Sequence, residues 1–428
     1  MIEFITLFLG GLMTGPRPVE IMAEDAVAIV EVWLDGELEQ RLNAPPWKLE
    51  VDFGPELLPH VLEAVALDSK AEELARTRQW INMSPRPAQS SVMIEGADQG
   101  KGAVARVSWE SLAETYEPQS IEVYFDGLRL AADDPRSILL PTFDPDQTHH
   151  MRVRLEFTEV LFSEAEAVFG GVYGNEISTE ISAVPIRFDK GRKPKSAHAM
   201  RDWFTVGGVP QNVHAVEKGL AEIIVVRDVA TDSRLSKLAA QAARLETDIY
   251  LKNHHRVSFI NPCPEVHRRG VLFRQRVYPH TPRYSSKDGT LLRLLAGLGH
   301  ANCTEQRQQL AEAVGVAGLS ASGDGLRRVV LLLLSSEPRD QSAFTPAQVV
   351  AYLDRMRVPL VIWSLGTPAG LETKWGQATN VRKLWRFDKA FNLLEKDLEH
   401  QLIVWLEGFH LPQAVELRPD VKDISLLE

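Results

Sequence analysis

The spacing of apolar residues changes once along the chain, and this change divides the chain into two halves. From about residue 2 to residue 188, apolar and polar residues alternate in short segments separated by Gly, Pro and Asp turns. Alternation with this period predicts β-strands with one buried face. From about residue 217, continuous apolar runs alternate with segments in which apolar residues recur every three or four positions. The second pattern predicts strands that alternate with helices.

A repeat in the front half sets the size of its units. Residues 31–36 read EVWLDG and residues 122–127 read EVYFDG, and each ends in the Asp-Gly pair that favours a tight hairpin. A second match aligns His60 with His150 at nearly the same offset of about 90 residues. Units of short strands with this length are typical of immunoglobulin-like sandwiches. We expect two all-β immunoglobulin-like sandwiches, with His60 and His150 at strand edges rather than in a metal site.

The turn-forming residues suggest where these units begin and end. We place the first sandwich at residues 1–83 and the second at residues 88–190. Between them, Ser84–Pro87 has the composition of a linker. After them, the basic stretch Lys190–Lys195 opens a second linker, which we place at residues 191–216.

The back half, residues 217–428, is expected to form an α/β Rossmann-like domain. Its alternating strands and helices predict a mostly parallel sheet with helices on both faces. The expected strands span residues 221–226, 256–260, 270–278, 328–334, 358–363 and 401–407. The expected helices span residues 233–251, 291–298, 305–314 and 381–398, and a further helix begins at Thr345-Pro346, with Thr345 as its N-cap.

Polar residues follow two of the expected strands and form the candidate site. Ligands of open parallel sheets bind at the carboxyl ends of the strands, near the point where the strand order reverses. Asp228 follows the first strand, and Ser335, Ser336 and Glu337 follow the central apolar strand. Thr290 precedes a helix between them. We expect these residues to lie at one edge of the sheet.

The order of these features resembles a known family. A strand that ends in Asp228, a Gly-Thr pair before a helix, an apolar strand, a helix begun by Pro346 and the segment Val358–Ser364 follow one another. Over residues 217–415 the chain resembles divergent bacterial von Willebrand factor A-type domains that follow immunoglobulin-like modules. The front half likewise resembles bacterial immunoglobulin-like modules, with Trp47 after its Asp-Gly turn. The resemblance implies a partner-binding domain, with the sandwiches as spacers.

The resemblance also implies a candidate metal site. Many A-type domains bind Mg²⁺ through Asp-x-Ser-x-Ser, a Thr and a further Asp. Asp228 and Thr290 match this pattern, but Ala230 and Asp232 occupy the two Ser positions, and the further Asp falls near Ser335. We expect no cofactor and keep Mg²⁺ at Asp228, Asp232 and Thr290 as the alternative. Without a metal, Asp228 and Asp232 are expected to cap the following helix.

Composition narrows the class of partner. The 428 residues carry a formal net charge of −11, which disfavours nucleic acid or an anionic membrane as the main partner. No segment is long and apolar enough to span a membrane, and Met1–Met13 lacks the features of a signal peptide, so we expect a strand there. The location of the protein stays open; the resemblance implies the cell envelope or the outside of the cell if a leader lies upstream.

The chain contains two cysteines, Cys263 and Cys303. We expect two buried or free thiols, with one disulfide bridge as the alternative.

Together these patterns predict a binding or scaffold protein rather than an enzyme. Its expected contacts with another protein are Asp228, Asp232, Thr290, Ser335, Ser336 and Glu337. A hydrolase is an alternative, but no Gly-rich phosphate loop, Gly-x-Ser-x-Gly or HExxH motif is present, and His254-His255 is expected in a surface turn. A carbohydrate-binding accessory protein is another alternative, which exposed Trp or Tyr on a sandwich face would favour. The identity of the partner and the oligomeric state stay open.

Overall fold

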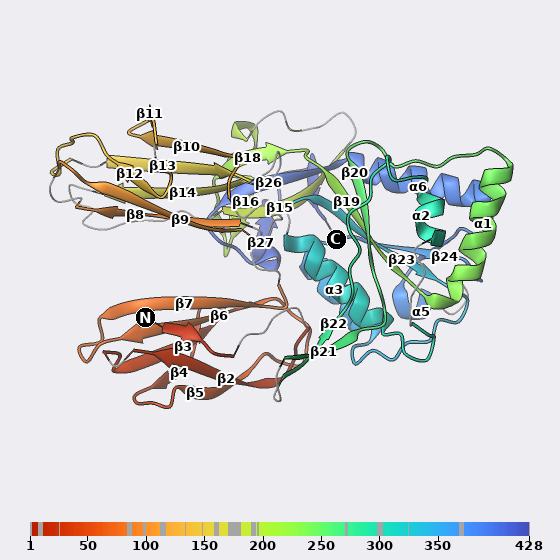
Figure 1. The fold of residues 1–428 in the computed structure, drawn as a ribbon, viewed down its shortest axis with the longest axis horizontal. Coiled ribbons are helices and arrows are strands. Elements are labelled where there is room, and N and C mark those ends of the chain that lie inside the picture. Colours follow the sequence, from red (N-terminus) through yellow and green to blue (C-terminus); the bar gives the residue numbers. More distant parts are fainter. Residues whose placement is uncertain are drawn as a thin grey trace.

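The computed structural model places two β-sandwiches, a mixed β unit and an α/β domain along the molecule (Figure 1). This arrangement confirms the expected order of β-sandwiches followed by an α/β domain. The residues that the structure describes are 2–6, 12–24, 26–83, 88–96, 100–111, 117–132, 134–147, 149–157, 162–169, 181–189, 194, 197–269, 273–297, 303–323, 325–367 and 372–427. The basic stretch Lys190–Lys195 lies outside the described residues apart from Pro194.

The first sandwich packs the sheet β1-β2-β5 against the sheet β4-β3-β6-β7. Its strands span Ile2–Phe4 (β1), Pro16–Ala23 (β2), Ile29–Leu34 (β3), Glu37–Leu42 (β4), Lys48–Asp52 (β5), His60–Leu67 (β6) and Glu73–Ile81 (β7). Alternate residues point into a shared core, where Val30, Val32 and Leu62 are fully buried. Strand β1 confirms the strand expected at the start of the chain, although residues 7–11 lie outside the described part.

The second sandwich packs the sheet β12-β9-β8 against the sheet β11-β10-β13-β14. Its strands span Ala88–Glu95 (β8), Val104–Ser111 (β9), Ser120–Phe125 (β10), Leu128–Leu130 (β11), Ser137–Leu139 (β12), His149–Glu156 (β13) and Phe162–Phe169 (β14). Val153, Leu155 and Ala165 are fully buried in its core. The two sandwiches therefore reach their stability through separate cores, as their alternating sequences predict.

Each sandwich contains the same Asp–His contact at its Asp-Gly turn. Asp35 and Asp126 have left-handed φ angles of 52° and 48°. Asp35 Oδ2 lies 2.6 Å from His60 Nδ1, and Asp126 Oδ2 lies 2.7 Å from His149 Nδ1. The other oxygen of each Asp accepts a hydrogen bond from the backbone N–H after the histidine. The repeat therefore pairs His60 with His149. The expected match to His150 was wrong by one position because His149, not the exposed His150, faces the core.

The α/β domain is built on a parallel sheet with the order β20-β19-β23-β24-β25. Its strands span Ala221–Arg227 (β19), His255–Ile260 (β20), Arg327–Leu334 (β23), Leu360–Ser364 (β24) and Ala378–Asn380 (β25). Its helices span Asp232–Arg244 (α1), Leu291–Gly297 (α2), Leu310–Gly323 (α3), Pro346–Arg355 (α4), Glu372–Trp375 (α5) and Leu384–Glu399 (α6). In β23, Leu331 and Leu333 pack with α1, α2 and α6, whereas Leu332 and Leu334 pack with α3 and α4. This alternation confirms the expected helices on both faces.

Some elements of this domain differ from their expected bounds. Helix α1 ends at Arg244 rather than at residue 251, because Glu246 adopts a left-handed φ of 52°. The strand expected at residues 270–278 is one arm of a separate antiparallel hairpin, which consists of Glu265–Arg269 (β21) and Phe273–Val277 (β22).

Helix α3 begins later than the expected range 305–314 and continues through two glycines. Glycine inside a helix costs about 1 kcal/mol relative to alanine, so the sequence disfavours a helix here. Packing explains the difference: a Cβ at Gly318 would lie 2.0 Å from Leu353 Cδ2 of α4, and one at Gly315 would lie 2.3 Å from Leu12 Cδ1. The glycines let helix α4 and the first sandwich approach α3 closely.

A third β unit combines segments from both sides of the α/β domain. Its sheets are β18-β26-β15-β28 and β17-β16-β27. Its strands span Ile181–Phe188 (β15), Phe204–Val206 (β16), Val209–Pro210 (β17), Val213–Glu217 (β18), Gln401–Glu407 (β26), Val415–Leu417 (β27) and Ile424–Leu426 (β28). Strand β15, expected in the second sandwich, pairs with β26, which was expected in the parallel sheet. Strands β16 and β17 lie in the expected linker. Alternation predicts a strand but not its partner, which explains these differences.

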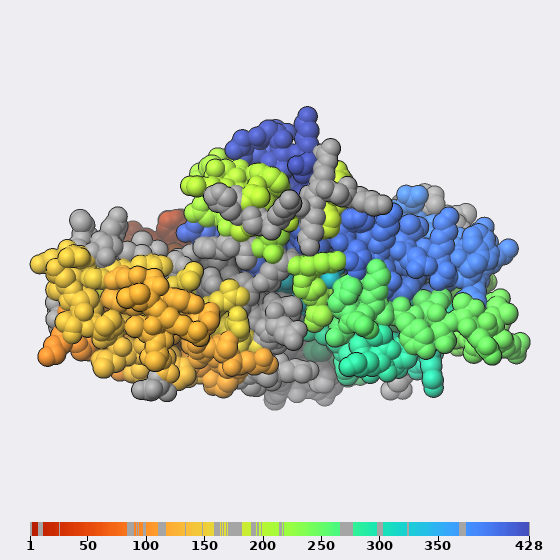
Figure 2. All heavy atoms as spheres, turned by 90° about the horizontal axis from the view of Figure 1, so that it is seen from above, coloured from red at the N-terminus to blue at the C-terminus, as the bar shows by residue number. Residues whose placement is uncertain are grey.

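The first sandwich packs against the α/β domain rather than serving as a loosely tethered spacer (Figure 1). Leu57 is 3% exposed and belongs to the core formed with α3 and α4. The buried Tyr352 hydroxyl of α4 donates a hydrogen bond of 2.7 Å to the Asn82 carbonyl. Figure 2 shows the second sandwich at one end of the elongated molecule and the α/β domain at the other. None of the described helices is long and apolar enough to cross a membrane.

Truncating Leu57 should weaken the contact between the first sandwich and α3. Leu57→Ala should lower the free energy of unfolding by about 2–4 kcal/mol, because it removes buried apolar atoms and leaves a cavity. Urea unfolding, with limited proteolysis of the first sandwich, measures the change. Leu38→Ala, at a position that is 47% exposed in the same sandwich, is the matched control. Equal stability of the two variants would contradict the buried contact.

The Asp126–His149 contact should make stability depend on pH. Burial disfavours the charged ring, but the hydrogen bonds with Asp126 and with the Asp144 carbonyl outweigh it and raise the pKa of His149. A raised folded pKa stabilises the protein fully below the unfolded value of about 6.5, and this stabilisation is lost as pH rises through the folded value. Urea unfolding should therefore show that the stability lost in Asp126→Asn is larger at about pH 6 than at about pH 8.5. A pH-independent loss would show that the charge contributes nothing.

Candidate functional site

The expected site lies at the switch point of the parallel sheet. After β19 the chain continues to β20 on one side, and β23 lies on the other side of β19. In open parallel sheets, ligands bind at the carboxyl ends of the strands that flank such a point. Asp228 directly follows β19 and Ser335 directly follows β23, and the Ser335 N–H donates a hydrogen bond of 3.1 Å to Asp228 Oδ2. The structure therefore brings together these two parts of the expected site.

Asp228 is fully buried, and hydrogen bonds from the chain occupy both of its carboxylate oxygens. Oδ1 accepts hydrogen bonds of 3.0 Å from Ala230 N and from Gln308 Nε2, while Oδ2 accepts the bond from Ser335 N. The bond from Ala230 caps the short 3-10 helix Val229–Thr231. The expected cap of the following helix α1 was wrong: Thr231 is its N-cap without a side-chain hydrogen bond, and Asp232 is its first residue. A buried carboxylate without such donors would be costly, so the network compensates its desolvation.

Gln308 is the central residue that the sequence reasoning missed. Its side chain is fully buried in the loop before α3. Nε2 donates to Asp228 Oδ1 and, over 2.7 Å, to the Arg339 carbonyl, while Oε1 accepts a hydrogen bond of 3.1 Å from Val229 N. One amide thus links the segments after β19, before α3 and after β23. Because Gln308 follows no strand, the search at strand ends could not find it.

The residues that the resemblance assigns to Mg²⁺ do not fit a cation. Mg²⁺ requires oxygen ligands in near-octahedral geometry, but Gln308 presents an N–H donor to Asp228. Asp232 pairs with Arg227, whose guanidinium lies 3.0 Å from its Oδ1. Burial lowers the pKa of Arg227 from its usual value, and Asp232 opposes this shift. Thr290 Oγ1 accepts a hydrogen bond of 3.3 Å from the backbone of α2. A guanidinium and an amide therefore face the two aspartates.

The loop after β23 is fixed at both ends and exposes charged residues between them. Ser336 Oγ accepts a hydrogen bond of 2.9 Å from Thr367 N in the loop after β24. Asp340 accepts hydrogen bonds of 2.9 and 3.1 Å from the first two backbone N–H groups of α3. Glu337 and Arg339, between these anchors, are exposed. We call Ser336, Glu337, Arg339 and Thr367 the carboxyl-edge rim.

Cys263 and Cys303 form a disulfide with an S–S distance of 2.03 Å. The expected free thiols were therefore wrong, and the alternative of one bridge is confirmed. Cys263 follows β20 and Cys303 precedes α3, so the fold brings together residues that are 40 positions apart in sequence. The bond tethers the segment that carries Gln308. Disulfides of this kind persist mainly in oxidising compartments.

The opposite, amino edge of the sheet holds a second charged cluster. His255 is fully buried, with Nδ1 3.2 Å from Glu395 Oε1, so the expected surface turn was wrong for this residue. His254 Nε2 lies 2.5 Å from Glu399 Oε1, and Lys218 donates to the other oxygen of Glu399. Burial alone would raise the pKa of Glu399, but hydrogen bonds from Lys218 and His254 outweigh it and lower the pKa to about 2.

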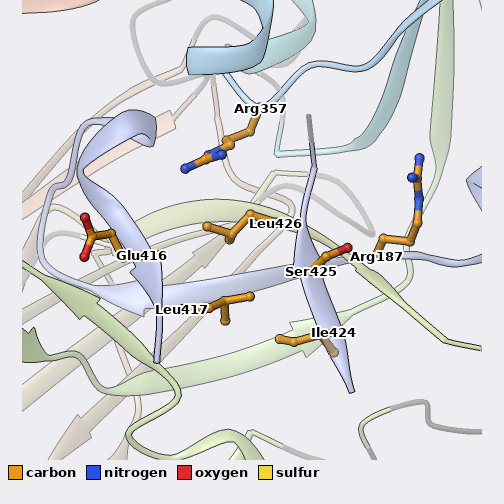
Figure 3. Close-up of a pocket in the computed structure, with 7 residues that line it drawn as sticks. All are labelled: Arg187, Arg357, Glu416, Leu417, Ile424, Ser425 and Leu426. Atoms are coloured by element: carbon orange, nitrogen blue, oxygen red, sulfur yellow. The ribbon is translucent and has the colours of Figure 1, made fainter. Parts of the chain in front are cut away.

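A surface pocket of about 560 Å³ lies between the third β unit and Arg357, which precedes β24 of the α/β domain. It is lined by Arg187, Arg357, Glu416, Leu417, Ile424, Ser425 and Leu426. Figure 3 shows Arg187 and Arg357 on different sides of Leu426. The pocket contains no residue of the expected site. Because its two arginines do not converge, it does not form a compact anion site.

Comparisons with known proteins do not identify a family for this chain. No known family model and no curated protein matches the sequence. The fibronectin(III)-like modules of Clostridium thermocellum CbhA are 16% identical over 19% of this chain and 93% of theirs, with a TM-score of 0.17. The central fibronectin-III array of RIM-binding protein is 10% identical over 47% of this chain and 82% of that chain, with a TM-score of 0.21.

A third similar structure is a β-glycosidase from Bacteroides vulgatus, which is 13% identical over 40% of this chain and 24% of that chain, with a TM-score of 0.20. All three TM-scores are below 0.5, so these similarities carry no argument about function. The description of the chain as β-sandwiches and an α/β domain rests on its own sheets.

Removing the Gln308 amide should destabilise the carboxyl edge. Gln308→Ala leaves the buried Asp228 carboxylate without one of its donors and should lower the free energy of unfolding by about 1–3 kcal/mol. Urea unfolding measures the loss, and hydrogen exchange in the loop after β23 localises it. Gln341→Ala, at a nearby exposed position, is the control. If both variants unfold like the wild type, the amide does not hold this edge together.

Proposed function

We propose that this chain is a non-enzymatic binding or scaffold protein that holds another protein at the carboxyl edge of its parallel sheet. The observation that carries the proposal is the hydrogen-bond network of Asp228 and Gln308. This network fixes the loop after β23 while Glu337 and Arg339 stay in solvent. A surface that is ordered before binding loses less conformational entropy when a partner docks.

The carboxyl-edge rim suits a polar protein surface. It combines one acidic residue, Glu337, with one basic residue, Arg339, and with the hydroxyl groups of Ser336 and Thr367. Charges of both signs favour a partner with complementary charges and give orientation to the complex. A nucleic acid would instead require a mainly basic surface. Asp232, whose side chain is 42% exposed, extends the rim.

We further propose that the α/β domain is a degenerate A-type domain that binds without a bridging cation. The strand order supports this assignment, because it places Asp228 at the switch point where the resemblance expects it. The neutral amide of Gln308 and the guanidinium of Arg227 supply the N–H donors that face Asp228 and Asp232. In this proposal, hydrogen-bond donors of the chain take the place of the cation.

The carbohydrate-binding alternative lacks the observation that would favour it. Trp47 and Trp109 are buried in the two sandwich cores. Trp80 stacks on Phe409 of the third β unit, with 4.1 Å between ring centroids. Among the described residues of both sandwiches, no Trp or Tyr is exposed. Trp33 and Tyr124 are half-buried, so the described aromatic residues of the sandwiches offer only partly exposed ring faces.

Reversing the charges of the rim should abolish partner capture without loss of stability. The double variant Glu337→Lys/Arg339→Glu places like charges opposite those of the partner and should reduce capture from native extract at least tenfold. Its urea unfolding should match that of the wild type, because both side chains are exposed. Capture by the wild type should persist in EDTA, since no cation bridges the complex.

A control variant changes exposed residues of the second sandwich, away from the rim. Leu128 and Leu139 are 72% and 69% exposed, and Leu128→Asp/Leu139→Asp should leave capture intact. Loss of capture in this control, together with full capture by the rim variant, would move the function to the sandwich. Loss of capture in EDTA would overturn the cation-free complex.

A further inference from the structure

We propose that His254, His255 and Glu399 form a binding site for a transition-metal ion such as Zn²⁺ at the amino edge of the parallel sheet. The inference is independent of the proposed partner binding, which uses the opposite edge. His255 is the first residue of β20, His254 lies in the turn before it, and the carboxylate comes from Glu399, the last residue of α6. The fold thus brings together ligands that are far apart in sequence.

The three side chains already lie close enough to share one ion. One ligand atom from each residue lies within 4.8 Å of the others. Glu399 Oε1 lies 2.5 Å from His254 Nε2 and 3.7 Å from His255 Nε2. Zinc binds nitrogen and oxygen ligands at about 2.0–2.2 Å, so ligand atoms around a tetrahedral ion lie roughly 3.3 Å apart. Modest side-chain rotations bring the three ligand atoms to this spacing.

A second observation points to a ligand for His255. Its side chain is fully buried, and its Nε2 has no hydrogen-bond partner among the described residues. A buried polar atom without a partner is unfavourable, because it has lost its hydrogen bonds to water. The atom faces Glu399 at a distance too long for a hydrogen bond. An ion between them would satisfy both the nitrogen and the carboxylate.

Glu395 prepares His255 for metal binding. Its Oε1 lies 3.2 Å from His255 Nδ1 and also accepts a hydrogen bond of 3.0 Å from the Lys252 backbone. A carboxylate that accepts a hydrogen bond from Nδ1–H keeps the proton on Nδ1 and leaves the Nε2 lone pair free for coordination, an arrangement common behind metal-bound histidines. Glu395 is therefore a positioning residue rather than a ligand.

The ligand set favours a particular class of ion. Imidazole nitrogens suit Zn²⁺ and neighbouring transition metals, whereas Mg²⁺ and Ca²⁺ prefer oxygen ligands. Three protein ligands leave a fourth tetrahedral position for water. The side chain of His254 is 41% exposed, so an ion can reach the site from solvent.

Two lysines compete with the ion for Glu399. Lys218 donates to Oε2, and Lys252 Nζ lies 3.4 Å from Oε1. Their side chains are 38% and 42% exposed, so both can move into solvent when a cation arrives. A purely structural ion-pair cluster would need no metal. The metal-site interpretation predicts that the loss of one lysine strengthens metal binding. The ion-pair interpretation predicts no metal binding with or without that lysine.

Calorimetry of the full chain, treated with chelator and titrated with ZnCl₂, tests the proposal. We expect one equivalent of Zn²⁺ to bind and to raise the thermal unfolding temperature. His254→Gln should weaken binding about tenfold or more, and Lys218→Gln should strengthen it, because a competing cation is lost. The exposed His150→Gln, in the second sandwich, should bind like the wild type.

Two results would overturn the site. One is the absence of heat and of any thermal shift in the wild type at millimolar Zn²⁺. The other is equal binding by the wild type and His254→Gln, which would place the ion elsewhere. Co²⁺ provides a second readout: a tetrahedral site gives intense visible absorption, which His254→Gln should remove. Neither outcome depends on partner capture at the carboxyl edge.

Discussion

The α/β domain depends on how a buried carboxylate finds its hydrogen-bond donors. Asp228 is fully buried, and its donors come from Ala230, Ser335 and Gln308 on three separate segments. Each donor is needed, because an unsatisfied buried charge costs more than the hydrogen bond itself contributes. The requirement therefore holds the ends of β19 and β23 and the start of α3 in one arrangement. The exposed rim is ordered because this buried network holds the loop after β23 in place.

Much of the fold follows from local pattern, whereas the site depends on long-range contacts. Local features can be recognised from the sequence. Examples are the apolar run of β23 and the N-cap of α4, where Thr345 and Gln348 form a capping box. Local pattern cannot predict contacts between residues that are far apart in the sequence. Examples are the pairing of β15 with β26, the disulfide and the hydrogen bonds of the Gln308 amide. Sequence alone therefore located Asp228 but not all of the donors that occupy its carboxylate oxygens.

The two edges of the sheet accommodate buried charge in different ways. At the amino edge, the guanidinium of Arg327 donates to the Leu398 carbonyl at the end of α6, and that of Arg328 donates to the Ala321 carbonyl near the end of α3. Burial lowers the pKa of each arginine to about 10, so both keep their charge at neutral pH. Cations at helix carboxyl ends are favoured by the helix dipole. Helix carboxyl ends thus accept hydrogen bonds from buried arginines at the amino edge, whereas backbone and side-chain N–H groups satisfy the buried carboxylate at the carboxyl edge.

The pairing of β15 with β26 has a consequence for the order of folding. Ser182 donates a hydrogen bond to the Gly408 carbonyl, 226 positions later, and the whole α/β domain lies between them in sequence. During synthesis from the amino end, β15 is made long before β26, so the edge that pairs with β26 stays unpaired until β26 is made. Such edges promote association with other chains. The third β unit can therefore close only after the residues of the α/β domain and of β26 have been made, so it closes late in synthesis.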